Sequence, residues 1–106
     1  MPSPLGIALS GIQSAQARIG ASAHNIANLQ TPGFRPLRAH QTSVASQASG
    51  LGGGSQVHVA QEPAPREVDL ARELLDQMLA GHQLMANLRV AGSLNELRGT
   101  LVDLFA

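Results

Sequence analysis

Aromatic residues are almost absent from this chain, because two phenylalanines make up 2% of its 106 residues and it has neither tryptophan nor tyrosine. Large rings supply much of the buried area in small compact domains. The apolar content is mostly Leu, Ile, Val and Ala, a set that suits the seams between helices. A self-sufficient globular core is therefore not expected.

Lysine and cysteine are missing altogether. All seven basic residues are arginines scattered along the chain, and the formal net charge is zero. Without a basic cluster we expect no nucleic acid partner and no anionic membrane surface. The absence of cysteine excludes disulfides, thiolate metal ligands and cysteine nucleophiles.

Long apolar runs are also missing, and none approaches the roughly 18 residues of a transmembrane helix. We therefore expect no direct membrane insertion. The N-terminus has neither a basic segment nor an unbroken apolar run, so no cleavable secretory signal is expected. Two possibilities follow: the protein stays in the cytoplasm, or it leaves by a route that reads no such signal.

A long first helix is predicted from about residue 4 to residue 29. Ser3 is suited to the N-cap and Pro4 to the first helical position. Apolar residues recur every seven positions, with Ala8, Ala15 and Ser22 between them, which is typical of a heptad seam. The residues predicted to pack in or beside this seam are Leu5, Leu9, Ile12, Ile19 and Ile26.

The stretch 22–34 ends this helix and turns the chain. Pro32 lacks a backbone N–H and disfavours helical geometry at Thr31, and the Pro-Gly pair favours a type II turn. Asn25 and Asn28 share one helix face, where they are expected to cap late carbonyls or to pair with the turn backbone. The predicted turn motif consists of Asn25, Asn28, Thr31, Pro32, Gly33 and Phe34, with a shape-setting and not a chemical role.

The middle segment, residues 35–66, is rich in Gly, Ser, Gln, Ala and Pro and is predicted to be a flexible linker, with a possible short strand at 56–60. Residues 67–106 are predicted to form a second long helix. The fold class expected is therefore all-α: an antiparallel helical hairpin or coiled coil of the N-terminal segment 1–34 and the C-terminal segment 67–106.

The second helix carries two neighbouring apolar stripes, which together are wider than one partner helix would cover. The excess has two interpretations, a private core or an assembly surface, and its width favours assembly. The residues of this helix predicted to pack in the assembly are Leu75, Leu79, Val90, Leu94, Leu97, Leu101 and Leu104.

No pattern in the sequence predicts catalysis. Histidines occur at 24, 40, 58 and 82 without the spacing of metal ligands. Ser22, His24 and Asp69 could be arranged on paper as a triad, but Ser22 and His24 are two apart on a helix and point to different faces. The carboxylates at 69, 73 and 76 are interpreted as a solvated charged face. We expect no enzyme, no cofactor and no metal site.

Two blocks of the sequence resemble the bacterial flagellar basal-body rod and hook family. The first block holds the sequence Ala-Leu-Ser-Gly-Ile-Gln-Ser-Ala-Gln at 8–16, Asn-Ile-Ala-Asn at 25–28 and Thr-Pro-Gly-Phe at 31–34. The second block, from Glu-Val-Asp-Leu at 67–70 to the ending at 97–104, is similar to the C-terminal helix of that family. The middle segment is shorter than in members with a folded outer domain, which indicates a short, proximal-rod-like member.

The resemblance implies a structural subunit of the flagellar rod whose terminal helices pair as a coiled coil and stack with other subunits. Its implied partners are copies of itself, other axial rod and hook proteins, and the flagellar type III export apparatus. The implied location is the periplasm-spanning basal body, reached without a cleaved signal. The alternative is a cytoplasmic, chaperone-like accessory paralogue that binds axial subunits or export components.

Overall fold

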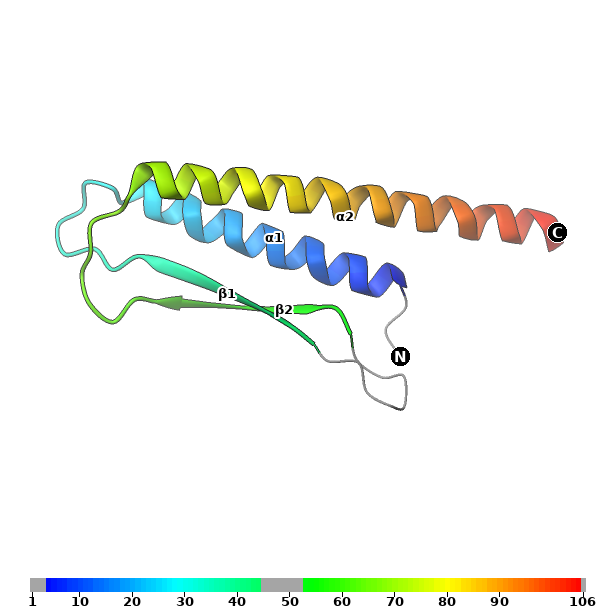
Figure 1. Cartoon of the computed structure of the whole chain (residues 1–106), viewed down its shortest axis with the longest axis horizontal. Helices are drawn as coiled ribbons and strands as arrows, with labels where there is room; N and C mark the ends of the chain where they lie inside the picture. Colours follow the sequence, from blue (N-terminus) through cyan, green and yellow to red (C-terminus); the bar gives the residue numbers. More distant parts are fainter. Residues whose placement is uncertain (1–3, 45–52, 106) are drawn as a thin grey trace.

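The computed structural model describes residues 4–44 and 53–105, and its elements follow the order helix, strand, strand, helix. The elements are α1 (Pro4–Ala27), β1 (Leu37–Ser43), β2 (Ser55–Gln61) and α2 (Leu70–Phe105). The molecule is elongated, with extents of 62 × 28 × 16 Å. Helix α1 lies between α2 and the two strands, and the turns that leave α1 and enter α2 lie at the same end of the molecule (Figure 1).

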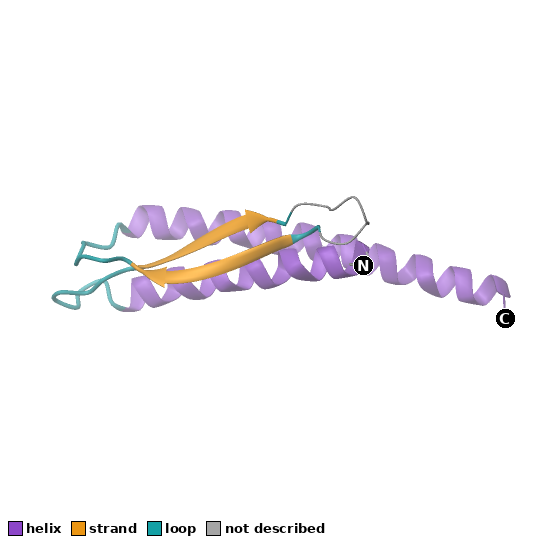
Figure 2. Cartoon of the chain, turned by 90° about the horizontal axis from the view of Figure 1, so that it is seen from below, coloured by secondary structure: helices purple, strands orange, loops and turns teal. Residues whose placement is uncertain are grey.

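The expected all-α fold is wrong, because the middle segment contains an antiparallel β-hairpin. Strands β1 and β2 pair from Leu37 with Gln61 to Ser43 with Ser55. The strand expected at 56–60 lies within β2, and β1 supplies the partner that a lone strand needs. Figure 2 shows the two strands lying along the helix pair. The expected linker is therefore structured at 37–43 and 55–61, and much of its Gly-rich centre lies outside the described residues.

Helix α1 ends at Ala27, two residues before the expected end. Gly33 then adopts a φ of +69°, and the Phe34 N–H donates to the Thr31 carbonyl at 3.3 Å. These are the features of the type II turn expected at Pro32-Gly33, in which glycine takes the positive φ without strain. The N-cap expected at Ser3 lies outside the described residues.

Helix α2 begins at Leu70, three residues later than expected, and its 36 residues exceed the 24 of α1. At 1.5 Å per residue the two helices span about 54 and 36 Å, so the C-terminal part of α2 runs beyond α1 (Figure 1). Within the described residues, no helix is both long enough and apolar enough to cross a membrane.

The interior of the molecule is built from small side chains. Its buried apolar residues are Ala8, Ala15, Ala21, Val68 and Ala80. Gly11 faces Asn87 so closely that an added Cβ would lie 2.6 Å from the Asn87 side chain, which indicates a close approach of α1 and α2. Ala15 and Ala80 are both fully buried. The helices therefore pair through a narrow seam that holds little apolar volume.

Candidate functional site

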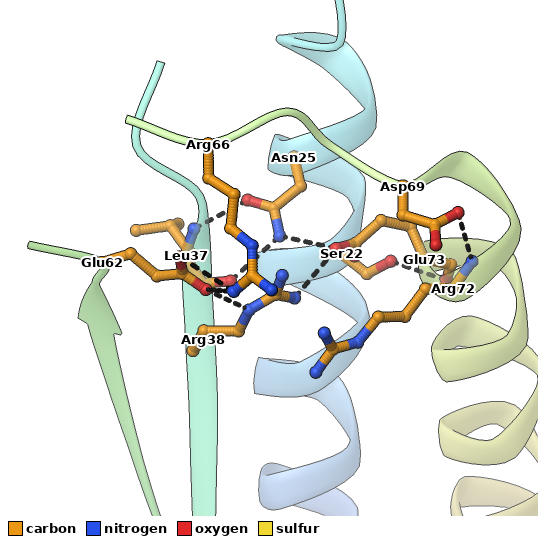
Figure 3. A network of polar contacts seen from close by, with 9 residues as sticks. All are labelled: Ser22, Asn25, Leu37, Arg38, Glu62, Arg66, Asp69, Arg72 and Glu73. Carbon is orange, nitrogen blue, oxygen red and sulfur yellow. Dashed lines mark hydrogen bonds and ion pairs between the residues drawn. The ribbon is translucent and has the colours of Figure 1, made fainter. Parts of the chain in front are cut away.

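A buried glutamate lies at the centre of the polar contacts that join the elements. Glu73, in the first turn of α2, is 1% exposed. Its Oε1 accepts hydrogen bonds from Asn25 Nδ2 at 3.1 Å and from Arg38 Nη1 at 3.0 Å (Figure 3). Its backbone carbonyl accepts from Ser22 Oγ at 2.9 Å. The interpretation of residue 73 as part of a solvated charged face is therefore wrong. Glu73, with the side chains of Ser22, Asn25, Arg38 and Glu62, is named the polar hub below.

Asn25 attaches the first strand to α1. Its Oδ1 accepts from the Leu37 N–H at 2.8 Å, and its Nδ2 donates to the Leu37 carbonyl at 2.9 Å. One amide side chain thus satisfies both backbone groups of the residue that begins β1. Asn28, by contrast, caps α1 itself, because its Nδ2 donates to the His24 carbonyl at 2.9 Å. The expected capping of a late carbonyl is thus confirmed for Asn28, whereas Asn25 pairs with the backbone of β1 and not with a late carbonyl or the turn.

Arg38 joins the hairpin to α2 through two carboxylates. Its Nε donates to Glu62 Oε1 at 2.7 Å, and its Nη1 reaches Glu73. Burial alone would lower the pKa of Arg38, but the hydrogen bonds and charges of Glu62 and Glu73 outweigh it and raise that pKa. The hydrogen bond from Arg38 lowers the pKa of Glu62, against a smaller opposing effect of desolvation. Arg66 adds a weaker contact to Glu62 at 3.4 Å.

The start of α2 is fixed by Asp69. Its Oδ1 accepts from the Arg72 backbone N–H at 3.3 Å, which makes Asp69 the N-cap of the helix. The cap places Glu73 one turn into the helix, facing α1 and β1. The N-cap at Asp69 therefore sets the position of Glu73, the charged residue at the centre of the polar hub.

The polar hub has the properties of a structural joint. Within residues 4–44 and 53–105, no buried side-chain nitrogen or oxygen lacks a hydrogen-bond partner, and no group of three or more metal-ligating residues occurs. The three residues considered as a triad have separate partners. Ser22 Oγ donates to the Glu73 carbonyl, and Asp69 caps α2. The ring centroids of His24 and Phe34 lie 5.5 Å apart. The hydrogen bonds of the polar hub join α1, β1 and α2, so these groups hold the elements in place.

The seam between the helices runs through other residues than those expected. On α1 the buried positions include Ala8, Ala15 and Ser22, the small residues between the predicted leucine and isoleucine positions. Leu5, Ile12, Ile19 and Ile26 are half-buried beside the seam, and Leu9 is exposed. Arg18 of α1 contacts α2, because its Nη1 donates to Gln83 Oε1 at 2.9 Å.

Only part of the predicted apolar set on α2 borders α1. Leu94, Leu97 and Leu101 lie with Pro4 and Leu5 along a largely apolar groove, and Leu94 is half-buried. Apart from Leu94, the predicted residues of α2 are exposed, with exposed fractions from 47% at Leu101 to 73% at Leu104; they are Leu75, Leu79, Val90, Leu97, Leu101 and Leu104. Further large apolar side chains are exposed along the same helix: Leu70, Leu74, Met78, Met85, Leu88 and Val102. The exposed large apolar side chains of α2 are named the α2 apolar face below.

Two features were missed from the sequence. Strand β1 has the sequence Leu-Arg-Ala-His-Gln-Thr-Ser, whose apolar residues are too few to signal a strand. The burial of Glu73 was not predicted, because the neighbouring residues 69 and 76 are also charged. Glu73 nevertheless begins a seven-residue spacing that marks one face of α2, formed by Glu73, Ala80, Asn87 and Leu94. That spacing was the available signal.

The comparisons with known proteins add no assignment: no protein-family model matches the chain, and no curated protein matches it significantly.

Proposed function

We propose that this chain is a structural subunit of the bacterial flagellar basal-body rod, which assembles with copies of itself and with other axial proteins through its long helices. The observation that carries the proposal is the α2 apolar face. Monomeric proteins rarely expose contiguous apolar patches larger than a few hundred Å². Here large apolar side chains are exposed from Leu70 to Leu104.

The small interior supports the same proposal. Alanines make up most of the buried apolar set, so the chain gains little hydrophobic stabilisation by folding alone. The exposed side chains of the α2 apolar face can be buried only by a partner. Partners that pack along it would be other helices, since α2 is one continuous helix and its exposed apolar side chains occur from Leu70 to Leu104.

The rod is proposed, among helical assemblies, because of the two sequence blocks that resemble the rod and hook family. In this proposal the subunit passes through the type III export apparatus without a cleaved signal and is incorporated in the periplasm-spanning basal body. Low burial supports this route, because a chain with a small interior unfolds at low cost before passage through a narrow channel.

The test is the presence of an epitope-tagged chain in purified hook-basal bodies, together with deletion of the gene. The proposal predicts a stoichiometric rod component and a deletion strain with an incomplete rod. Absence from basal bodies together with an intact rod in the deletion strain would contradict it. A stable complex with rod subunits in the cytoplasm of export-blocked cells would favour the accessory paralogue instead.

A substitution sharpens this test. Met78 is 62% exposed, so Met78→Asp should leave the isolated fold intact while placing a charge in the proposed interface. We expect the variant to be exported and absent from basal bodies. Asn95→Asp, which adds the same charge at an exposed polar position of α2, is the control and should be incorporated normally.

A further inference from the structure

Two histidines that are far apart in the sequence face each other across the hairpin. His40 of β1 pairs directly with His58 of β2 in the antiparallel register. Directly opposed residues project to the same face of a sheet, with Cβ atoms about 4.5–5.5 Å apart. At that separation the two imidazole rings can reach one ion between them.

The groove around the two histidines is lined by uncharged residues. Both histidines line one groove of about 540 Å³ between the hairpin and α1. The remaining lining residues are Ser10, Gln13, Ser14, Thr42, Ser55, Gln56 and Val57, and none of them is charged. Imidazole nitrogens suit copper, nickel and zinc, and the groove has room for water molecules at the other coordination positions.

We propose that His40 and His58 form a two-imidazole site for a late first-row divalent metal ion, which bridges β1 and β2. Carboxylates do not line the groove, so hard ions such as Mg²⁺ and Ca²⁺ are not expected to bind there. Because two ligands impose little geometry on the ion, affinity should follow the general order in which Cu²⁺ binds more tightly than Ni²⁺ or Zn²⁺.

The bridge has a structural consequence for the hairpin. A two-stranded hairpin is marginally stable by itself, and a shift of one residue in the pairing would send the two rings to opposite faces. An ion bound by both rings selects the observed register and links the strands near their middle. The inference is independent of the proposed function, because it rests on the hairpin and not on the α2 apolar face.

The experiment is a titration of the full chain with Cu²⁺ and, separately, with Zn²⁺ at pH 7.5, where metal ions compete well with protons for imidazole nitrogens. The variants are His40→Gln and His58→Gln. The controls are His24→Gln and His82→Gln, which remove the other two histidines of the chain, both exposed. Amide hydrogen exchange and electron paramagnetic resonance of the Cu²⁺ complex are recorded on each protein.

The wild type should bind one Cu²⁺ through two nitrogen ligands, and the ion should slow exchange of the strand amides. Either hairpin variant should bind about tenfold more weakly or worse, since even the loss of an outer-shell partner commonly costs that much. The controls should match the wild type. Equal weakening by the control variants, or unchanged affinity in His40→Gln, would overturn the proposal.

Discussion

The two ends of α2 differ in how their side chains are satisfied. At the first turn, Glu73 is 1% exposed and is held by Asn25, Arg38 and, through its backbone, Ser22. Towards the C-terminal end, Leu97 and Leu104 are 56% and 73% exposed. The polar end is completed within the chain, and the apolar end is not.

This difference separates two tasks. Hydrogen bonds and ion pairs depend strongly on direction, so the polar hub fixes how the hairpin and the two helices meet. Apolar burial is non-directional and roughly proportional to area, so the α2 apolar face can stabilise contacts with several neighbours. The polar hub determines the shape within the chain, and in the proposed assembly the α2 apolar face would supply the association energy.

The largest expected loss of stability comes from removing the carboxylate of Glu73 at the first turn of α2. Glu73→Ala removes the carboxylate that bonds Asn25 and Arg38, and it leaves both side chains partly unpaired in a covered site. Loss of one partner of a buried ion pair costs about 3 kcal/mol or more. The free energy of unfolding from urea titration should fall by that amount.

Glu96→Ala, at an exposed glutamate on the same helix, is the matched control and should change stability by less than about 0.5 kcal/mol. Equal effects of the two substitutions would show that the hub does not hold the fold together.

A second substitution tests the hydrogen-bonding direction in the hub. Asn25→Asp keeps the size of the side chain but removes the donor to the Leu37 carbonyl and places a second carboxylate beside Glu73. We expect a loss of about 2 kcal/mol at pH 7, from the unmet acceptor and from like-charge repulsion.

Repulsion raises the pKa of the introduced carboxyl group, so its protonated form is favoured in the fold. The deficit relative to wild type should therefore shrink as pH falls from 7 to 5 in parallel urea titrations. A deficit independent of pH would contradict the placement of the two groups.

Acid should weaken the attachment of the hairpin. The pKa of Glu62 is lowered by the hydrogen bond from Arg38. A carboxylate with a lowered pKa stabilises the fold above its unfolded-state pKa of about 4.3, and this contribution is lost as pH falls through the folded-state value. The protection factors of the β1 amides, in which the intrinsic pH dependence of exchange is divided out, should fall over that acidic range. In Glu62→Gln the protection factors should lose this part of their pH dependence, and an unchanged profile would contradict the role of Glu62.

The smallest expected effects concern glycines in α1. Gly20→Ala adds a methyl group where nothing lies within 4 Å, so it should stabilise the helix by about 1 kcal/mol. In Gly11→Ala the same gain is offset, because the methyl group would displace the Asn87 side chain from its 2.9 Å bond to the Gln83 carbonyl. Thermal unfolding of the two variants should differ by several degrees, and identical shifts would show that the helices do not approach closely at Gly11.

The sequence predicted the two long helices, the turn at Pro32-Gly33 and a strand within 56–60, because each has a local signal in its residue types and spacing. It did not predict β1, since that strand forms through pairing with β2 and through the bonds of Asn25 to Leu37, which are 12 residues apart. The heptad period on α1 was visible, yet the small residues Ala8 and Ala15 occupy the seam in place of the larger ones. Which side of a heptad is buried depends on how closely the neighbouring helix approaches, and that distance is set by tertiary contacts such as Gly11 against Asn87.

The most direct test of the account is sedimentation equilibrium of the purified chain over a wide range of concentrations. The α2 apolar face predicts that the average mass of the wild type rises with concentration. Met78→Asp should weaken association by about tenfold or more, which corresponds to 1.4 kcal/mol, and Asn95→Asp should not. A wild type that remains monomeric at all concentrations and still unfolds cooperatively would contradict the claim that this face is completed by partners.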